Sequence, residues 1–363
     1  MTKAAELAKM GEVLTNSQIG GRRNIIINGA MQVAQRGDTA SVQTGYGGCD
    51  RFQFATSGTC RVTLKQSTDV PSNQGFINSQ QVDVTTADTS LAASDFAQIR
   101  TKIEAQDLQH LKYGTSEAEK LTLQFWVKSS KTGTHIIELY HYDANYQNNQ
   151  TYTISSANTW QKVTVTFDGY QTTNFANDNG IGLGVQWWLL AGSTYSSGTL
   201  TSNTWHNTQA NRTVGQVNVM DSTDNNFYLT GVQLEVGSQD TPFESRSFGE
   251  ETALCQRYFY RVGDNAHTSP ICNMMAYSNN DIYGACRLPT KMRTRPSIAY
   301  SSLPRAYKVA GDAVVDSVSI NTANSSTQDL RLYAGKSSYF SSGNASWLQV
   351  PSTSDSFDFD SEL

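Results

Sequence analysis

A strand, a turn and a helix follow one another in Asn225–Phe259, NNFYLTGVQLEVGSQDTPFESRSFGEETALCQRYF, and this stretch decides how the 363-residue chain is divided. The apolar residues alternate from Phe227 to Val236 and change phase at Thr230–Gly231, which predicts a half-buried strand with a β-bulge. An S-x-x-E capping box that begins at Ser247 predicts a short linker helix near 248–260. The chain before this helix therefore differs in organisation from the chain after it.

Upstream of this stretch, apolar and polar residues alternate with period two in Leu121–Lys128, Ile136–His141 and Lys162–Phe167. Clusters of Gly, Asn, Asp and Ser separate these segments, as expected for an antiparallel β-sandwich. Residues 92–111 have mixed spacing, and two interpretations stay open there. The segment is either a helix, or a strand followed by one turn.

The last third of the chain also carries strand patterns. The candidate strands are Asp281–Leu288, Ser297–Tyr300, Val314–Ile320, Asp329–Tyr333 and Phe357–Phe359. Their spacing predicts a smaller C-terminal β-sandwich, and no repeat of fixed period indicates a solenoid or propeller. The predicted fold class is therefore all-β.

The first 22 residues form a separate short segment. Ala4, Leu7, Ala8 and Leu14 lie on one stripe of a predicted N-terminal helix, and Gly20–Gly21 end it. A helix this short needs a partner surface in water. We expect it to dock on another protein or on sister chains, and the alternative is a frayed tail.

Composition excludes several classes of partner. Charged residues make up 16% of the chain, the net charge is −5, and no long basic run indicates nucleic acid. No apolar run is long enough for a membrane span, and the first residues lack the apolar core of a secretory signal. The five cysteines include no C-x-x-C pair, so buried free thiols are expected.

Several motifs together resemble those of tail-fibre and receptor-binding proteins of tailed bacteriophages. They are NIIINGAMQVAQRG (Asn24–Gly37), the stretch Asn225–Phe259, LPTKMRTRPSI (Leu288–Ile298) and the closing FDFDSEL. EKLTLQFWVKSSKTGTHIIELY, followed by NTWQKVTVTFDG, is similar to the jelly roll of carbohydrate-binding modules. That likeness covers roughly residues 24–259 and implies a jelly-roll sandwich that meets sugars.

The resemblance implies three domains: a virion-anchoring segment (1–22), a carbohydrate-binding-like jelly roll (23–247), and the linker helix with a distal β-domain (248–363). It further implies a homotrimer in the tail of a virion assembled in the host cytoplasm. Its partners would be other virion proteins, through the N-terminal segment, and host cell-surface polysaccharide. A head fibre or capsid decoration protein is one alternative, and a polysaccharide depolymerase is another. A secreted lectin is disfavoured because the signal segment is missing.

Enzyme signatures are absent from the sequence, which favours a protein without catalytic activity or cofactor. There is no G-x-S-x-G, H-E-x-x-H or Walker motif. His135 and His141 share one strand face, but Glu138 points to the other, so the three cannot form a metal triad. A glycosidase carboxylate pair has no sequence signature of its own, which keeps the depolymerase alternative open.

Glycan binding needs exposed aromatic rings near amides or carboxylates. The candidate residues are Trp187, Trp188, Tyr195 and Trp205 in the jelly roll, and Tyr339 and Trp347 in a predicted distal loop, YFSSGNASW. The adjacent Trp187 and Trp188 must face opposite sides of a strand, so one is expected in the core. The outward ring contacts either sugar or a covering loop or subunit.

Two loops rich in Asn and Asp could hold a structural calcium ion. Their acidic residues are Asp178, Asp221 and Asp224. Calcium accepts such oxygen ligands. The alternative is that these residues only form turns, because Asn and Asp tolerate turn conformations.

Overall fold

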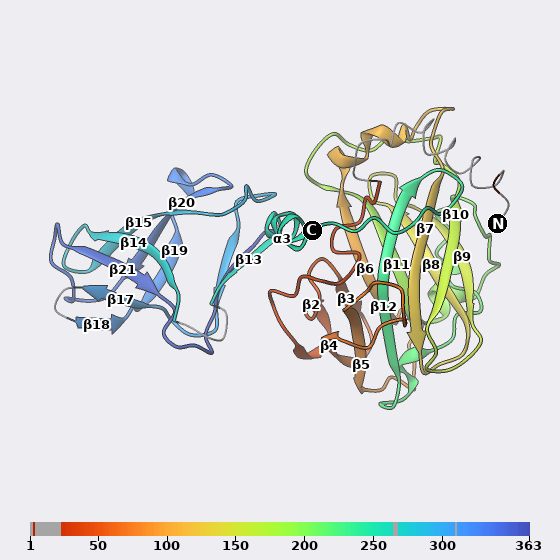
Figure 1. The fold of residues 1–363 in the computed structure, drawn as a ribbon, viewed down its shortest axis with the longest axis horizontal. Coiled ribbons are helices and arrows are strands. Elements are labelled where there is room, and N and C mark those ends of the chain that lie inside the picture. Colours follow the sequence, from red (N-terminus) through yellow and green to blue (C-terminus); the bar gives the residue numbers. More distant parts are fainter. Residues whose placement is uncertain (1–2, 4–22, 264–267, 309–310) are drawn as a thin grey trace. The chain divides into compact units, whose positions relative to one another are not determined.

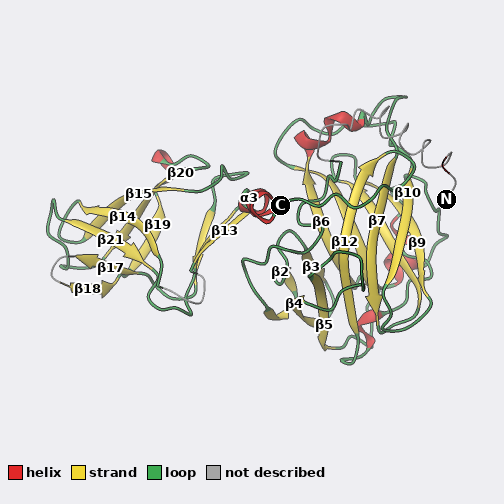
Figure 2. Ribbon diagram, in the orientation of Figure 1, coloured by secondary structure: helices red, strands yellow, loops and turns green. Residues whose placement is uncertain are grey.

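The computed structural model describes Lys3 and residues 23–263, 268–308 and 311–363. Apart from Lys3, the predicted N-terminal helix lies outside the described residues. The chain divides into two compact units, one running through Glu251 and including Leu363, the other formed by Thr252–Glu362. Strands dominate both units, and the helices are few and short (Figure 2). The predicted all-β class is confirmed.

Two antiparallel six-stranded sheets face each other in the first unit (Figure 1). The first sheet has the order β1 (Thr39–Val42), β4 (Arg61–Ser67), β5 (Ser79–Thr86), β12 (Asn226–Val236), β7 (Leu121–Ser129), β10 (Gln161–Phe167). The second has the order β2 (Thr44–Tyr46), β3 (Gln53–Thr56), β6 (Phe96–Glu104), β11 (Ile181–Ala191), β8 (Gly133–His141), β9 (Tyr146–Ile154). Strands distant in sequence pair in each sheet, which gives the sandwich its jelly-roll character.

The apolar alternation of these strands produces one core between the sheets. Phe125 on β7 and Trp187 on β11 meet edge to face with ring centroids 5.6 Å apart. Phe52 packs against the same indole at 6.2 Å, and Tyr152 packs against Phe125 at 5.3 Å. Inward residues are fully buried, so the other parity of each strand is left for the outer faces.

The predicted bulge lies in β12. Its pairing with β7 changes register between Thr230 and Gln233. Gly231 sits there with a φ of 59°, a conformation that glycine adopts without a steric penalty.

The open alternative at 92–111 is decided in favour of a strand and a turn. β6 spans Phe96–Glu104, and the 3₁₀-helix η1 (Ala105–Leu111) follows at once. The amides of Ala105 and Gln106 donate to the carbonyls of Gly180 and Asp178, which ties the turn to the loop before β11. The outward side chains of β6 consequently stand beside those of β11.

The linker helix begins where the capping box predicts. α3 spans Phe248–Gln256, and the Glu250 amide donates to the Ser247 hydroxyl at 3.3 Å. Residues 259 and 260 already belong to the next strand. The remaining helical turns are α2 (Ser193–Ser196), η2 (Gln209–Asn211), η3 (Val219–Asp221) and η4 (Thr322–Asn324).

The second unit consists of a curled seven-stranded sheet and a three-stranded sheet around one core. The large sheet has the order β18 (Gly311–Val314), β17 (Arg305–Lys308), β21 (Ala345–Gln349), β14 (Pro270–Ala276), β15 (Asp281–Arg287), β20 (Asp329–Gly335), β19 (Ser317–Ile320). The small sheet has the order β13 (Phe259–Val262), β22 (Phe357–Asp360), β16 (Ser297–Tyr300).

Two sequence expectations fail in this unit. Residues 314–320 are not one strand, because the amides of Val315 and Asp316 bond to the carbonyls of Pro304 and Gly335 and turn the chain between β18 and β19. Trp347 is not in a loop either, because it lies on β21, paired with Asn273 of β14 and Tyr307 of β17. All five cysteines are free thiols, and all but the half-buried Cys272 are buried.

Candidate functional site

Three neighbouring strands of the second sheet, β6, β11 and β8, place polar and aromatic side chains side by side. Arg100 pairs with Gln186 and Gln98 pairs with Trp188 across β6 and β11. Gln186 in turn pairs with Glu138 on β8. Because their strand neighbours point into the core, these residues stand on the outer face of the sheet.

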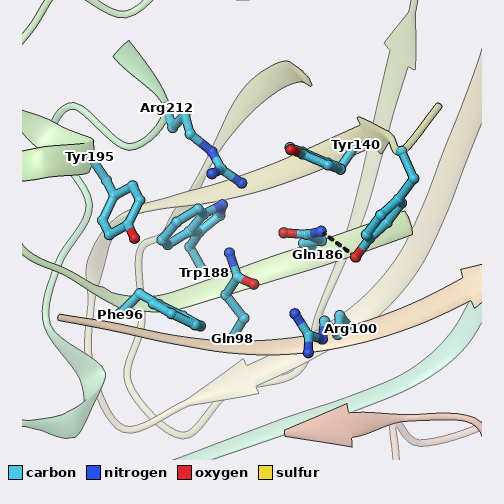
Figure 3. A pocket seen from close by; sticks show the side chains of 9 residues that line it. Phe96, Gln98, Arg100, Tyr140, Gln186, Trp188, Tyr195 and Arg212 are labelled. Carbon is cyan, nitrogen blue, oxygen red and sulfur yellow. Dashed lines mark hydrogen bonds between the residues drawn. The ribbon is translucent and has the colours of Figure 1, made fainter. Parts of the chain in front are cut away.

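The indole of Trp188 forms the floor of this face. Its ring packs against Tyr195 at 5.3 Å and Phe96 at 6.3 Å. Only 1% of the residue is exposed. The indole Nε1 is buried and has no hydrogen-bond partner within the described part of the chain. In Figure 3 this nitrogen lies on the side of the ring toward Arg212 and Tyr140.

A buried ion pair closes one side of the site. The Arg212 guanidinium donates to Glu138 through Nε at 2.9 Å and Nη2 at 2.5 Å. Burial alone would lower the pKa of Arg212, but the charge of Glu138 and these hydrogen bonds outweigh it, so the pKa is raised. The guanidinium also lies 4.9 Å from the ring centroid of Trp188 and 5.2 Å from that of Tyr140. These contacts fix the position of the Arg212 guanidinium, which therefore forms a rigid side of the site.

The opposite side carries polar groups that remain available. The Gln98 side chain makes no hydrogen bond to any described residue, although it is buried at the foot of the hollow. Gln186 uses only its Nε2, which donates to the Tyr142 hydroxyl at 3.4 Å (Figure 3). Arg100 uses only its Nε, which donates to Gln53 at 2.8 Å.

These groups surround a hollow of about 210 Å³. Its lining residues are Phe96, Gln98, Arg100, Tyr140, Tyr142, Gln186, Trp188, Tyr195 and Arg212. Burial raises the pKa of both Tyr140 and Tyr142, which keeps these phenols neutral donors at physiological pH. The described residues of the lining comprise five aromatic side chains, two amides and two guanidinium groups, and no carboxylate is among them.

Two other hollows lack the combination of aromatic and polar groups that lines the first. One, along residues 39–46 with Thr56, has Tyr46 as its single aromatic residue. The other, in the second unit, is lined by Tyr283, Arg331 and the neighbouring residues of β15 and β20. Neither combines an aromatic floor with several unpartnered polar groups.

The structure separates the six predicted sugar-binding residues. Trp188 and Tyr195 line the hollow together, but Trp188 is only 1% exposed and packs against Tyr195, so the outward ring is covered and not exposed as expected. Trp187, the other member of the pair, is fully buried in the sandwich core, so the expectation that the two face opposite sides is confirmed. Trp205 does not line the hollow, because its Nε1 donates to the Asp168 carbonyl at 2.6 Å and its ring packs against Tyr170 at 5.2 Å.

The other two predicted residues lie in the second unit. Tyr339 packs against Phe340 at 5.1 Å, and the Lys308 ammonium lies 3.8 Å from its ring centroid. Trp347 is 40% exposed and stacks on Tyr307 with the rings 5.2 Å apart and nearly parallel. Neither residue belongs to a strand that lines the hollow or that pairs with one of those strands.

The residues considered for calcium are already engaged in local contacts. An Asp178 oxygen accepts from the Gly180 amide at 2.8 Å, which closes a turn. Asp221 pairs with Lys131 and accepts from Asn225 at 2.7 Å. Asp224 lies two residues before β12, and its amide donates to the Ser222 hydroxyl at 3.1 Å. Within the described ranges no three His, Cys, Asp or Glu side chains come together as metal ligands.

Sequence reasoning missed Gln98, Arg100, Tyr140 and Arg212 as site residues. Gln98 and Arg100 could have been predicted from the sequence, because their spacing in the alternating segment of β6 places both on the same face of the strand. Arg212 could not, because its partner Glu138 lies 74 residues away in sequence. His135 and His141, on the inner parity of β8, are both buried and bond to the carbonyls of Lys131 and Thr173.

Comparison with known proteins gives distant likenesses of fold. No family model matches the chain, and no curated protein matches it. It is similar to the enzymatically active domain of tailspike protein 4 of bacteriophage CBA120, with 15% identity and a TM-score of 0.33. That likeness covers 59% of this chain and 22% of the tailspike chain.

Carbohydrate-binding modules give likenesses of the same size. A family 11 module of a cellulosomal cellulase of Clostridium thermocellum has 11% identity and a TM-score of 0.28, over 56% of this chain and 97% of the module. TmCBM61, solved in complex with β-1,4-galactotriose, has 9% identity and a TM-score of 0.31, over 60% of this chain and 100% of the module. At this level the likeness does not bear on the ligand of this chain. None of the described helices has the length and apolarity to cross a membrane.

Proposed function

We propose that this chain is a non-enzymatic structural protein of a tailed-phage virion, a tail fibre that attaches to host surface glycans through its jelly-roll unit. The observation that carries the proposal is the hollow on β6, β11 and β8, where an aromatic floor meets unpartnered polar groups. The assignment to a phage particle rests on the sequence motifs described above.

The chemistry of the hollow suits a polyol. Sugar rings have apolar faces that pack on aromatic side chains, and hydroxyls that both donate and accept hydrogen bonds. The Gln98 amide and the Gln186 carbonyl oxygen supply both kinds of partner.

The absence of acids in the lining supports binding without cleavage. Glycoside hydrolysis uses two carboxylates on either side of the scissile bond. Glu138 lies on this face, and it is fully buried and held by Arg212 and by Asn149 at 2.7 Å. A depolymerase would need its acid pair elsewhere on the chain.

The test is binding of the purified chain to host surface polysaccharide, measured by affinity electrophoresis. The double variant Gln98→Ala with Gln186→Ala should weaken binding about tenfold, because two hydrogen bonds of roughly 0.7 kcal/mol each are lost. Gln161→Ala, on β10 of the other sheet, is the matched control and should bind as the native chain does. Equal binding by all three proteins would place the sugar elsewhere, and release of reducing sugar would show catalysis.

The proposal includes a homotrimer, which follows from the same sequence resemblance. Large side chains exposed in the second unit, such as Met275 at 59% and Tyr277 at 69%, are surfaces that a sister subunit would cover. Light scattering should give a mass near three times 39.9 kDa. A clean monomer would instead favour the capsid decoration alternative, and imaging of particles with a labelled chain separates tail from head.

A further inference from the structure

The hollow carries an uncompensated positive charge. Arg100 and Arg212 both line it, and no carboxylate does. The charge of Arg212 is matched by Glu138, whose two oxygens both accept from its guanidinium. Arg100 forms no ion pair with any described residue, so its charge is the one that a ligand meets.

Arg100 is also held in place. Its Nε donates to Gln53 on β3 at 2.8 Å, and its strand position opposite Gln186 points it to the outer face. The two terminal Nη groups make no hydrogen bond within the described ranges, and Arg100 is one of the residues that line the hollow. Gln98 lies two residues earlier on the same strand, and Figure 3 shows both side chains rising from β6 on the same side.

We propose that this hollow selects an acidic saccharide, whose carboxylate lies against the Nη groups of Arg100 while its ring hydroxyls reach Gln98 and Gln186. This inference rests on the proposed function and names its ligand class as sugars of the uronic or sialic acid type. A carboxylate matches the two parallel donors of a guanidinium and carries the opposite charge, which a neutral hydroxyl does not.

The arrangement also explains why the buried Glu138 does not repel such a ligand. The Glu138 oxygens accept hydrogen bonds from Arg212 and Asn149, so the negative charge of Glu138 is neutralised within the protein. The ligand carboxylate would therefore lie at the Arg100 end of the hollow, where the guanidinium has no ion-pair partner among the described residues. An acidic residue on the lining would cancel this preference, and none is present there.

The experiment compares acidic polysaccharides, such as polygalacturonate, hyaluronate and a sialic acid polymer, with their carboxyl-reduced forms, which keep the same ring stereochemistry. Dextran sulfate is the arm for sulfate esters. Binding of the full chain, of Arg100→Gln and of Arg100→Lys is measured by affinity electrophoresis at low and physiological salt. Arg61→Gln, a half-buried arginine on β4 of the other sheet, is the matched control.

We expect at least one acidic polymer to bind ten- to a hundredfold more tightly than its reduced form, as for a charge-assisted contact. Arg100→Gln should remove that difference and its salt dependence, so that this variant binds the acidic and the reduced forms with equal affinity. Arg100→Lys should keep part of the difference in affinity between the acidic and the reduced form. Arg61→Gln should keep all of this difference.

Four results would overturn the inference. Equal binding of acidic and reduced forms by the native chain leaves the proposed glycan binding intact but removes the acid preference. Loss of both forms in Arg100→Gln assigns Arg100 a structural role, and binding of dextran sulfate alone replaces carboxylate by sulfate. If no polymer of either set binds, the proposed function fails together with the inference.

Discussion

Glu138 is the residue on which the candidate site depends most. It is fully buried, and its partner Arg212 is 8% exposed, so neither charge can be solvated if the other is removed. We expect Glu138→Ala to lower the free energy of unfolding by about 3–5 kcal/mol, because it leaves a buried guanidinium unpaired. Urea unfolding of the native chain and the variant measures this difference.

The matched control is Glu119→Ala, which breaks the exposed pair with Lys112 at 2.8 Å. An exposed pair contributes about 0–1 kcal/mol, so this variant should unfold close to the native midpoint. Equal losses in the two variants would contradict the assignment of Glu138 as a buried, charge-paired support of the hollow.

His135 predicts a specific dependence of stability on acid. Burial lowers its pKa from the usual 6.5 to about 4 in the folded chain, and the Lys131 carbonyl offsets this only in part. The unfolded chain therefore takes up the proton first as the pH falls below 6.5, and folding loses about 3 kcal/mol by pH 4. His135→Gln should reduce this loss, seen as a smaller shift of the urea midpoint between pH 7 and pH 4.5. An unchanged shift would mean that other groups carry the acid sensitivity.

For single residues, the sequence predicts well which face of a strand a side chain occupies. It predicts poorly which residues far apart in the chain contact each other. Period-two alternation correctly separates Trp187 from Trp188, and Glu138 from the two buried histidines of β8. It does not bring Arg212 to Glu138, because that contact depends on a loop that crosses the outer face of the sheet. The role of Arg100 stays hidden while the helix alternative for its segment is open.

Among the elements, β12 shows how one glycine fixes the register of a strand. Gly231 has a positive φ, and a Cβ added there would lie 2.6 Å from Phe76 and 3.0 Å from Trp126. We expect Gly231→Ala to destabilise the chain by about 1–3 kcal/mol, since it adds backbone strain and a clash. Thermal unfolding measures the effect.

Gly215→Ala is the control for Gly231→Ala. Its φ is also positive, but nothing lies within 4 Å of the added Cβ. The control should therefore show the backbone strain alone and a smaller loss of stability. If the two variants lose the same amount, the packing of Phe76 and Trp126 over the bulge does not contribute.

Strands with strong alternation were predictable and strands with mixed composition were not. β7, β10 and β12 are found from their apolar parity alone, because one face of each packs against the core of the sandwich. β14 begins with Pro270 and mixes Cys, Asn and Met within its apolar pattern. β21 lies next to a loop rich in Ser, Gly and Asn. Their strand state comes from pairing with each other and with β15 and β17, which sequence periodicity does not reveal.

For the whole molecule, we predict that the first unit binds glycan without the second. The lining of the hollow falls between residues 96 and 212. A fragment should extend to residue 256, because Glu251 accepts from the Asn28 amide at 2.5 Å and Arg246 donates to the Ile26 carbonyl. Residues 23–256 should bind a soluble oligosaccharide within about twofold of the full chain, measured by calorimetry.

The complementary fragment, residues 257–363, is the control for this prediction. It contains Tyr339 and Trp347, the other predicted sugar contacts. Binding by this fragment with none by residues 23–256 would move host recognition to the second unit. Binding by both would show two sites, with the avidity of a multivalent chain.

The most direct measurement of the central claim is a crystal structure of the chain with a bound oligosaccharide from a polymer that it recognises. We predict sugar density in the hollow on β6, β11 and β8, with hydroxyls on Gln98 and Gln186. Sugar seated on Trp347 or Trp205, with the hollow filled by water alone, would contradict the account.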